Sequence, residues 1–538
     1  MRPQGYRSPW PPDWRSMAWN RLDQGWDVII VGGGITGAGI LAVAARCGLR
    51  VLLLEQADFA SGTSGRSSKM VHGGLRYLKH FHLKLTRESV QERQYLLHAA
   101  SGLVDPLSFI YPVYKGDSPG PWLMGIGLGI YTHLASDAGK SRRLDSVDLS
   151  MRAPGLRMHN LERGFQYTDA QTDDARLVLR VLHDGLLAAK GKAVALNYCR
   201  AAKPIFKGRR AVGIQVRDEA TGKTAEVSAS VVINASGVWA DELRSEMGAR
   251  KRLRPLRGSH LFFSLERFPV YQAIAFGHPD DGRPVFVYPW EGVSLVGTTD
   301  VDHRYPLTDE PMISVEEADY LLRGVQECFP DLELAKADVV SSQAGVRPVV
   351  DTGKKDPSQE SRDYVVWPER GLLTVTGGKL TTFRLIAIDA LRAAHEMNPK
   401  IPAPNSDMSV FNNIILSNSI PGVSPEMAPR LCGRYGSAAP MLAAGAPEWL
   451  TPVQGTPYMW AELIWAAQNE AIVHLDDLLL RRFRLGILLA DGGLSLLPSL
   501  KKWLQKSLGW DDAHWTREVE RFWSIWQIAH GLPPGWKE

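Results

Sequence analysis

The first strong pattern of apolar residues lies between residues 27 and 55. Residues 27–31 and 51–54 are apolar runs without polar alternation, which is typical of parallel strands buried on both faces. The small apolar residues of 35–47 favour a helix between them. The segment therefore predicts a strand, a tight glycine turn, a helix and a second strand.

Further along the chain, strand patterns come in clusters. Short strands bounded by Gly and Asp turns recur through 193–216 and 226–234, and another group spans 260–300 and 363–376. Clusters of strands separated by helices predict an α/β architecture with a second, more antiparallel sheet.

The last quarter of the chain has a different pattern. Pro and Asn gather at 399–423, where the periodicity stops, and this predicts a linker. Residues 424–538 have a mostly helical pattern with Arg-rich and Trp-rich amphipathic stretches. A chain of 538 residues exceeds one ordinary core, so two or three domains are expected.

Composition limits the classes of function. The net charge is +4 (62 − 58), which suits an anionic substrate or membrane surface but is far from a nucleic-acid signature. No run of 18 apolar residues occurs, and residues 122–135 are too few to span a bilayer. The cysteines form no C-x-x-C pair, which indicates a reducing cytosolic compartment and no disulfide framework, zinc or iron–sulfur site. They are Cys47, Cys199, Cys328 and Cys432.

A dinucleotide fingerprint follows the first predicted strand. Residues 32–37 read Gly-Gly-Gly-Ile-Thr-Gly, matching G-x-G-x-x-G. Gly32 permits the tight turn, Gly34 lets the backbone approach a pyrophosphate, and Gly37 allows close helix–strand packing. Glu55, at the end of the second strand, is placed to accept hydrogen bonds from an adenosine ribose.

A second stretch separates FAD from NAD. Residues 231–241 run from an apolar strand into Ala235, Ser236 and Gly237. This pattern resembles the second FAD-contacting strand of two-dinucleotide-type flavoproteins. After the first fingerprint, it makes FAD the better interpretation.

Four segments together resemble the FAD-dependent glycerol-3-phosphate dehydrogenase family. They are residues 63–78, 167–177, 342–348 with 361–364, and 377–382. Smaller similarities occur at 257–260, 297–300 and 481–484. The resemblance covers nearly the whole chain from about residue 24. Departures from the usual family residues, at Gly65, Val238 and Phe383, remove no candidate charged group.

The resemblance implies glycerol 3-phosphate as substrate, with cations converging at the flavin. Arg76, Arg347 and Lys379 lie in the shared segments, and Tyr77 can add a hydroxyl donor. A dianionic phosphate needs such groups, because Arg offers a bidentate fork and Lys a point charge. A surface or salt-bridge role is the alternative for each arginine taken singly.

Oxidation at C2 also requires removal of the hydroxyl proton, and His is the usual base. His72 and His260 both lie in the shared segments. Each is equally explained as a structural hydrogen-bond donor, and a neighbouring cation that lowers the hydroxyl pKa is a third alternative. Arg347 is therefore also a candidate catalytic group.

The remaining cofactor candidates come from the same segments. We expect Ser64, Ser67, Ser68 and Lys69 to line the flavin phosphates or ribityl chain. We expect Gly378, Leu380 and Thr381 to lie at the isoalloxazine end. Asp173, Asp174 and Arg176 favour a structural interpretation, a helix cap with an internal ion pair. No metal-ligand spacing occurs, so no metal is expected.

The expected fold is α/β: a two-dinucleotide-type, Rossmann-like FAD-binding domain, an antiparallel-sheet substrate domain and a C-terminal helical domain. We assign 24–100, 155–250 and 340–395 to the first, 101–154 and 251–339 to the second, and 400–538 to the third.

The resemblance implies a membrane quinone as electron acceptor, since the related oxidases carry a central insertion for which this chain has no obvious room. Tail tryptophans beside Lys501, Lys502 and Lys506 suit a lipid headgroup region. Two alternatives stay open for the tail, an ordinary helical core and a homodimer interface. The expected location is cytoplasmic, peripheral on the cytoplasmic face of the inner membrane.

Three other functions are alternatives for a chain with this pattern. The first is an oxygen-reducing glycerol-3-phosphate oxidase. The second is an amine or 2-hydroxy-acid oxidase, which the three cations disfavour because a carboxylate needs fewer. The third is a flavin-binding scaffold or sensor without turnover, in which loss of the histidines or the cations would be expected.

Overall fold

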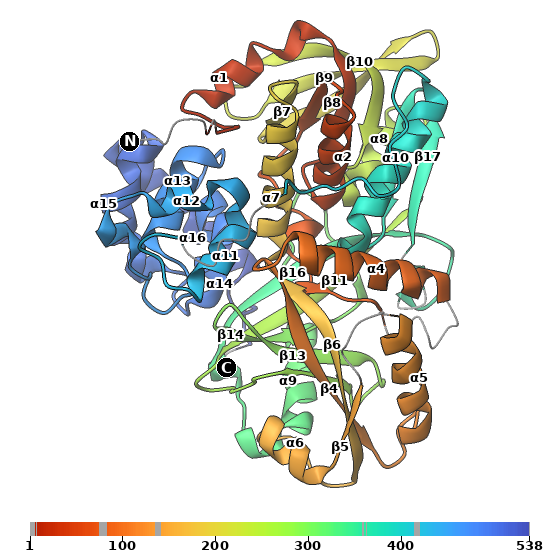
Figure 1. Cartoon of the computed structure of the whole chain (residues 1–538), viewed down its shortest axis with the longest axis vertical. Coiled ribbons are helices and arrows are strands. Elements are labelled where there is room, and N and C mark those ends of the chain that lie inside the picture. Colours follow the sequence, from red (N-terminus) through yellow and green to blue (C-terminus); the bar gives the residue numbers. More distant parts are fainter. Residues whose placement is uncertain are drawn as a thin grey trace.

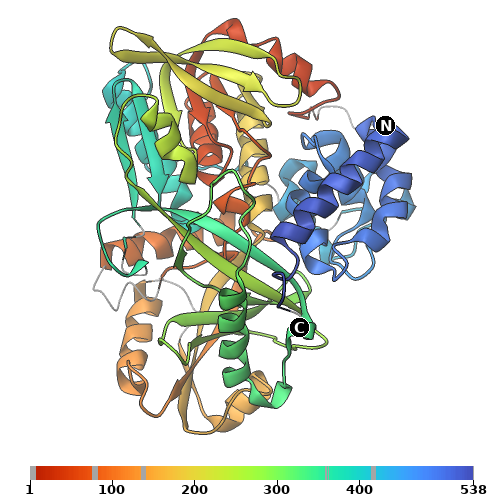
Figure 2. The same cartoon turned by 180° about the vertical axis from the view of Figure 1, so that it is seen from behind.

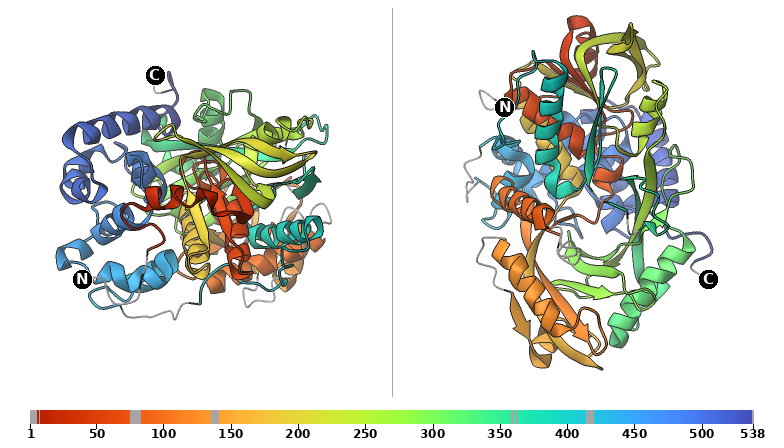
Figure 3. Two further views of the ribbon diagram at one scale, coloured as in Figure 1. Left: turned by 90° about the horizontal axis from the view of Figure 1, so that it is seen from above. Right: turned by 90° about the vertical axis from the view of Figure 1, so that its right-hand side faces the viewer.

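Two mixed sheets lie one above the other along the molecule, and a group of helices lies beside them (Figure 1). The computed structural model describes residues 6, 8–74, 83–134, 141–357, 360–361, 363–413 and 420–536. The side view in Figure 3 shows the same two levels.

The upper sheet is built around four parallel pairings, β18–β10, β10–β1, β1–β2 and β2–β7. The antiparallel strand β17 closes one edge, and β8 and β9 extend β10. The strands are β1 (Trp26–Val31), β2 (Val51–Leu54), β7 (Ala193–Leu196), β8 (Cys199–Lys207), β9 (Arg210–Asp218), β10 (Thr224–Asn234), β17 (Tyr364–Glu369) and β18 (Leu372–Gly377).

Strand β1 shows why its sequence is apolar throughout. Val28 and Ile30 belong to one core, beneath α2 (Ile35–Arg46), α7 (Asp174–Ala188) and α10 (Phe383–Met397). Ile29 belongs to a second core on the other face, with residues of β8, β9 and β10. Because both faces are covered, neither can be polar.

The lower sheet is almost entirely antiparallel, with one parallel pairing between β12 and β4. Its strands are β3 (Met70–Val71), β4 (Val104–Tyr114), β5 (Arg142–Leu144), β6 (Leu161–Thr172), β11 (Leu253–Ser264), β12 (Ala273–Gly277), β13 (Pro284–Trp290), β14 (Val293–Gly297), β15 (Val301–Asp302) and β16 (Val339–Val350). Helices of this part are α4 (Leu83–Ala99), α5 (Pro121–Leu134), α6 (Ser146–Arg152) and α9 (Val315–Cys328).

Sheet membership differs from the expected domain limits at three strands. β3, β6 and β16 fall in segments assigned to the FAD-binding domain, but they pair in the lower sheet. The reason is long-range pairing: β6 pairs along all of β4, and β16 along nearly all of β11. The division into domains otherwise stays a prediction.

The C-terminal helices pack against both sheet domains, as the view from behind also shows (Figure 2). They are α11 (Met427–Tyr435), α12 (Ala439–Ala443), α13 (Trp460–Asn469), α14 (Leu485–Leu488), α15 (Leu497–Leu508) and α16 (Asp512–Ala529), with a π-helical turn at Asp477–Arg482. Short helices α1 (Trp14–Trp19) and α8 (Ala240–Ser245) complete the fold.

The tail tryptophans pack inward. Trp515 and Trp526 are buried, and Trp503, Trp510 and Trp523 are partly buried against the same core. The ordinary helical core therefore accounts for these side chains. In the described part of the chain, no helix combines the length and apolar character needed to cross a bilayer.

Candidate active site

A deep cavity opens where the parallel strands of the upper sheet end. Val31, Leu54, Ala235 and Val375, at or just after the carboxyl ends of β1, β2 and β10 and within β18, lie in its wall. This edge is where doubly wound sheets bind ligands. The cavity encloses about 1440 Å³ of empty space, including its open mouth. Ten predicted residues line it: Gly32, Gly34, Glu55, Ser64, Ser67, Ala235, Gly237, Gly378, Lys379 and Leu380.

The glycine turn is required by close backbone contacts. Gly32 has φ 111°, and a Cβ there would collide with the Ala235 carbonyl. A Cβ on Gly37, which lies outside the cavity wall, would collide with the Gly32 carbonyl. Gly34 caps α2, and the Ile35 amide donates to Ser64 Oγ at 2.9 Å. The turn thus leaves a helix N-terminus facing the cavity, a favourable place for a pyrophosphate.

Glu55 is fixed at the opposite side of this turn. Its Oε2 accepts from the Gly33 amide at 2.6 Å, and its Oε1 accepts from the Ala57 amide at 2.9 Å. Burial raises the pKa of Glu55, while these backbone hydrogen bonds oppose the rise. The carboxylate is thereby held rigidly in the cavity wall.

His260, on β11, lies behind the cavity wall. Its Nε2 is 2.9 Å from Ser68 Oγ, and the side chain is buried. Burial, with the nearby charges of Lys69 and Arg347, holds the pKa of His260 well below its usual range. The imidazole is therefore neutral at neutral pH.

His72 is placed differently. Its backbone amide donates to Thr381 Oγ1 at 3.2 Å, and Thr381 Oγ1 donates to the His72 carbonyl at 3.2 Å. This pair of contacts fixes the segment after β3 to the residue that follows Leu380 in the cavity wall. Neither His72 nor Thr381 itself lines the cavity.

The predicted cations have distinct environments. Arg347 lies one residue before Pro348 of the cavity wall, and its guanidinium donates to Asp300 Oδ1 and Thr298 Oγ1, both at 3.0 Å. Lys379 lines the cavity, with its Nζ 3.4 Å from Ser89 Oγ on α4. The other two predicted substrate contacts, Arg76 and Tyr77, lie outside the described residues.

Comparison with known proteins places these features in one family. Residues 27–384 match the model of the FAD dependent oxidoreductase family, and 390–515 match that of the C-terminal domain of alpha-glycerophosphate oxidase. An aerobic glycerol-3-phosphate dehydrogenase of Staphylococcus saprophyticus is 35% identical over 488 residues, covering 86% of this chain and 87% of the relative. The chain belongs to the FAD-dependent glycerol-3-phosphate dehydrogenase family.

Two further matches extend along nearly the whole chain. Glycerol-3-phosphate dehydrogenase 2 of Mycobacterium tuberculosis is 34% identical over 540 residues, covering 95% of this chain and 91% of the relative. A solved structure of the glycerol-3-phosphate dehydrogenase from Bacillus halodurans complexed with FAD has a TM-score of 0.77 and 26% identity, covering 97% and 98% of the two chains. The predicted family and fold class are confirmed, and FAD is the cofactor.

The residues of the cavity fit FAD. The glycine turn lets the chain at Gly32 pass close against the Ala235 backbone and leaves the N-terminus of α2 open to the cavity, and the Glu55 carboxylate stands at the strand end where a ribose hydroxyl can donate to it. Gly377 and Gly378 form the wall beside Leu380 at the other end of the same cavity.

Besides Gly37 and Thr381, the structure places two further predicted FAD contacts, Lys69 and Ser68, outside the cavity wall. The Lys69 ammonium is buried away from the cavity, where it donates to Gln343 Oε1 at 2.8 Å and lies 3.4 Å from both Asp174 oxygens. Burial lowers the pKa of Lys69 to about 8, against the opposing charge of Asp174. Ser68 also lies outside the wall and contacts His260.

Asp173, Asp174 and Arg176 form the predicted helix cap but not the predicted internal ion pair of Arg176. Asp173 does cap α7 by accepting from the Arg176 amide. However, Arg176 forms no internal pair: its guanidinium binds Glu470 of the C-terminal domain through two hydrogen bonds of 2.6 and 2.7 Å. Sequence proximity favoured a local partner, whereas folding brings a distant one closer.

Several wall residues were not predicted, among them Arg200, Glu242 and Trp239. Arg200 and Glu242 pair across 3.7 Å at the rim, and Trp239 donates its indole N–H to the Leu307 carbonyl. Trp239 lies two residues after Gly237, so the strand-then-glycine signal could have included it. Arg200 follows Cys199, whose amide donates to the Glu55 carbonyl at 2.7 Å, and this long-range contact brings the start of β8 to the cavity.

Proposed function

We propose that this chain oxidises sn-glycerol 3-phosphate to dihydroxyacetone phosphate and passes the electrons to a membrane quinone. The observation that carries the proposal is the position of Lys379 in the wall of the FAD cavity, with Arg347 adjoining Pro348 of the same wall. The names of the relatives at 34–35% identity support the same substrate.

The cations supply the phosphate recognition. The ion pair with Asp300 fixes the plane of the Arg347 guanidinium, and a fixed fork binds phosphate oxygens without further ordering. Lys379 adds a point charge from the side of α4. Arg76 and Tyr77 stay predicted contacts of the same pocket.

Oxidation at C2 removes a hydride from carbon and a proton from the hydroxyl, leaving a ketone. When bound, FAD accepts the hydride and with it two electrons. We propose His260 as the base, because it lies directly behind the cavity wall in contact with Ser68, and its neutral imidazole has a ring nitrogen free of a proton. Binding of a dianion would raise the low pKa of His260, since opposite charge favours the protonated form.

The two histidines are distinguished by their pH dependence. We expect His260→Asn to lower the rate of flavin reduction and to remove the ionisation that limits that rate at low pH. His72→Asn should leave that ionisation in place. The reverse result would make His72 the base, and an unchanged ionisation in both variants would favour a cation that lowers the hydroxyl pKa.

The substrate is tested by following the flavin absorbance without oxygen. Glycerol 3-phosphate should bleach the band promptly, whereas glycerol, glycerol 1-phosphate, lactate and amino acids should not. Lys379→Met should raise the concentration needed for half-maximal bleaching, while Lys84→Met, at an exposed position of α4, should not. A flavin that stays oxidised in the wild-type protein would refute the proposal.

The electron acceptor is tested by reoxidation of the same reduced protein. A dehydrogenase should be reoxidised slowly by air and quickly by a quinone analogue. Fast reoxidation by air would instead indicate the oxidase.

For the membrane surface we propose the outer face of α5, at the edge of the lower domain (Figure 1). Trp122, Leu123, Ile126 and Ile130 are 77, 59, 41 and 47% exposed, and the helix contains no charged residue apart from any charge on His133. Exposed apolar patches of this kind mark contact sites. The exposed Arg143 lies beside Gly125 of α5 and suits an anionic headgroup.

Co-sedimentation with vesicles containing phosphatidylglycerol tests this surface. Trp122→Ser with Ile126→Ser should weaken binding, whereas Ile528→Ser, at a similarly exposed apolar residue of α16, should not. Equal binding by all three proteins would exclude α5.

A further inference from the structure

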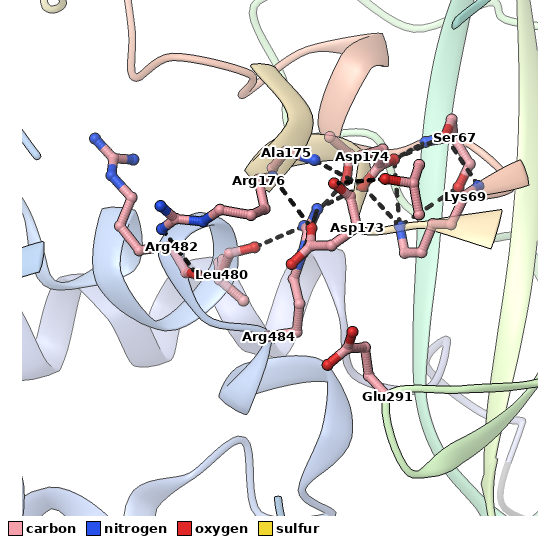
Figure 4. Close-up of polar contacts among 12 residues, drawn as sticks. Ser67, Lys69, Asp173, Asp174, Ala175, Arg176, Glu291, Leu480, Arg482 and Arg484 are labelled. Atoms are coloured by element: carbon pink, nitrogen blue, oxygen red, sulfur yellow. Dashed lines mark hydrogen bonds and ion pairs between the residues drawn. The ribbon is translucent and has the colours of Figure 1, made fainter. Parts of the chain in front are cut away.

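Two of the family-like segments have no role in the reaction as proposed, and folding brings them into contact. One, residues 167–177, contains Asp173 and Asp174 at the start of α7, and the other, residues 481–484, ends in Arg484 of the C-terminal domain. Figure 4 shows Arg484 extending from the C-terminal ribbon to the two aspartates, with Ser67 and Lys69 on the far side of Asp174.

The guanidinium of Arg484 is buried and binds several groups at once. It donates to Asp173 Oδ1 at 2.9 and 3.1 Å, to the Gly65 carbonyl at 3.2 Å and to Asp174 Oδ1. Only a planar fork can reach these positions together, because an ammonium group is a point donor. Arg484 therefore joins the C-terminal domain to both α7 and the segment 65–69.

The other oxygen of Asp174 faces the active site. Its Oδ2 accepts from the Ser67 amide at 2.9 Å and from the Ser67 hydroxyl at 2.8 Å. Ser67 lines the FAD cavity, and Ser68 contacts His260 Nε2. The buried Asp174 carboxylate thus lies between Arg484 and Ser67, and Ser67 is followed directly by Ser68.

We propose that Arg484 is a positioning residue: it orients Asp174, which fixes Ser67 in the FAD cavity wall and Ser68 against His260. The C-terminal domain thereby holds the active-site segment from behind.

Arg176 supplies a matched control for simple domain attachment. It is buried on the same helix as Asp174 and forms a bidentate pair with Glu470 of the C-terminal domain. Within the described part of the chain, its guanidinium forms hydrogen bonds with Glu470 and the Arg482 carbonyl and with no group of residues 65–69. Loss of the Arg176 guanidinium should weaken the contact between α7 and the C-terminal domain without moving residues 65–69.

The experiment compares Arg484→Lys with Arg176→Lys in the full-length, FAD-loaded protein. We expect Arg484→Lys to speed hydrogen–deuterium exchange in peptides covering residues 60–74 and to slow flavin reduction by glycerol 3-phosphate about 10–100-fold, the loss expected of a small misplacement. FAD content should be retained. Arg176→Lys should change neither measurement. Equal effects of the two variants on both measurements would overturn the proposal.

A second pair of variants tests the proposal even if Arg484→Lys does not fold. Asp174→Asn weakens the acceptor for Ser67, whereas Asp173→Asn changes a carboxylate that contacts Arg484 and Arg434 but not the segment. Only Asp174→Asn should speed exchange in residues 60–74, and equal exchange would overturn the proposal.

The kinetic measurement rests on the proposed function. If glycerol 3-phosphate does not reduce the wild-type flavin, that function fails, while the exchange comparison still decides the role of Arg484.

Discussion

Replacing Glu55 by Gln should weaken FAD binding without disturbing the fold of the cavity. In the wild-type chain both carboxylate oxygens accept backbone N–H bonds, from Gly33 at 2.6 Å and from Ala57 at 2.9 Å. Glutamine replaces one oxygen with an NH₂ group, so one of these amides faces another donor. A ribose hydroxyl that donated to a charged oxygen then meets a neutral one.

The weaker hydrogen bond from the ribose hydroxyl determines how much FAD affinity is lost. A hydrogen bond to a charged group contributes about 1.5–3 kcal/mol and a neutral one about 0.5–1.5 kcal/mol, so the difference is about 1–2 kcal/mol. That corresponds to a Kd roughly 5–30-fold higher. The loss of a backbone partner affects the protein with and without FAD, and it should appear mainly as lower stability.

The assay is titration of the apoprotein with FAD, followed by quenching of flavin fluorescence. Glu242→Gln is the control, because Glu242 lies in the same cavity wall but forms an exposed pair with Arg200 at 3.7 Å. Such pairs contribute about 0–1 kcal/mol, so FAD affinity should hardly change. Unchanged affinity in Glu55→Gln, or an equal loss in Glu242→Gln, would refute the reasoning.

Three further outcomes follow from the packing. Gly258→Ala would place a Cβ against the Arg347 guanidinium, so kcat/KM for glycerol 3-phosphate should fall about tenfold or more with FAD content unchanged, as steady-state kinetics would show. Arg482→Met leaves the buried Asp58 carboxylate with a weaker set of partners and should cost about 3 kcal/mol in urea unfolding, against less than about 1 kcal/mol for the exposed Arg142→Met. Burial opposes ionisation of Asp58, but the arginines outweigh it and lower its pKa from 3.8 to about 2. Its contribution is therefore nearly full above about pH 4 and is lost as the pH falls toward 2, so the gap in Tm between wild type and Asp58→Asn should narrow between about pH 4 and about pH 2.

The dinucleotide turn could be predicted from sequence because its requirements are local. Gly32 and Gly34 follow an apolar strand at fixed spacing, and Glu55 ends the next strand. Parallel strands of one sheet end at the same edge, so spacing along the chain already implies proximity in space. Lys379 was likewise predicted from its position in a shared segment, and it lines the cavity in the structure.

Lys69 shows where that reasoning stops. It lies in the same segment as Ser64 and Ser67, which line the cavity, yet its side chain turns to Asp174 and Gln343. Lys69 has φ 53°, and a local reversal of the backbone decides which side of the segment each residue faces. Motif membership fixes the neighbourhood of a residue but not the direction of its side chain.

Only the tertiary structure shows which groups the tail tryptophans and Arg484 contact. An amphipathic helix with Trp on one face has the same pattern whether that face meets lipid or a core, and packing decided for the core at Trp515 and Trp526. Arg484 and Asp174 are 310 positions apart, and no periodicity links them. Sequence by itself determined the cofactor turn, because that rests on short-range spacing, and it determined the family through the shared segments, which in turn supplied the candidate cations. The tertiary structure decided which charges pair in the interior, because buried ion pairs form between whichever elements folding brings together.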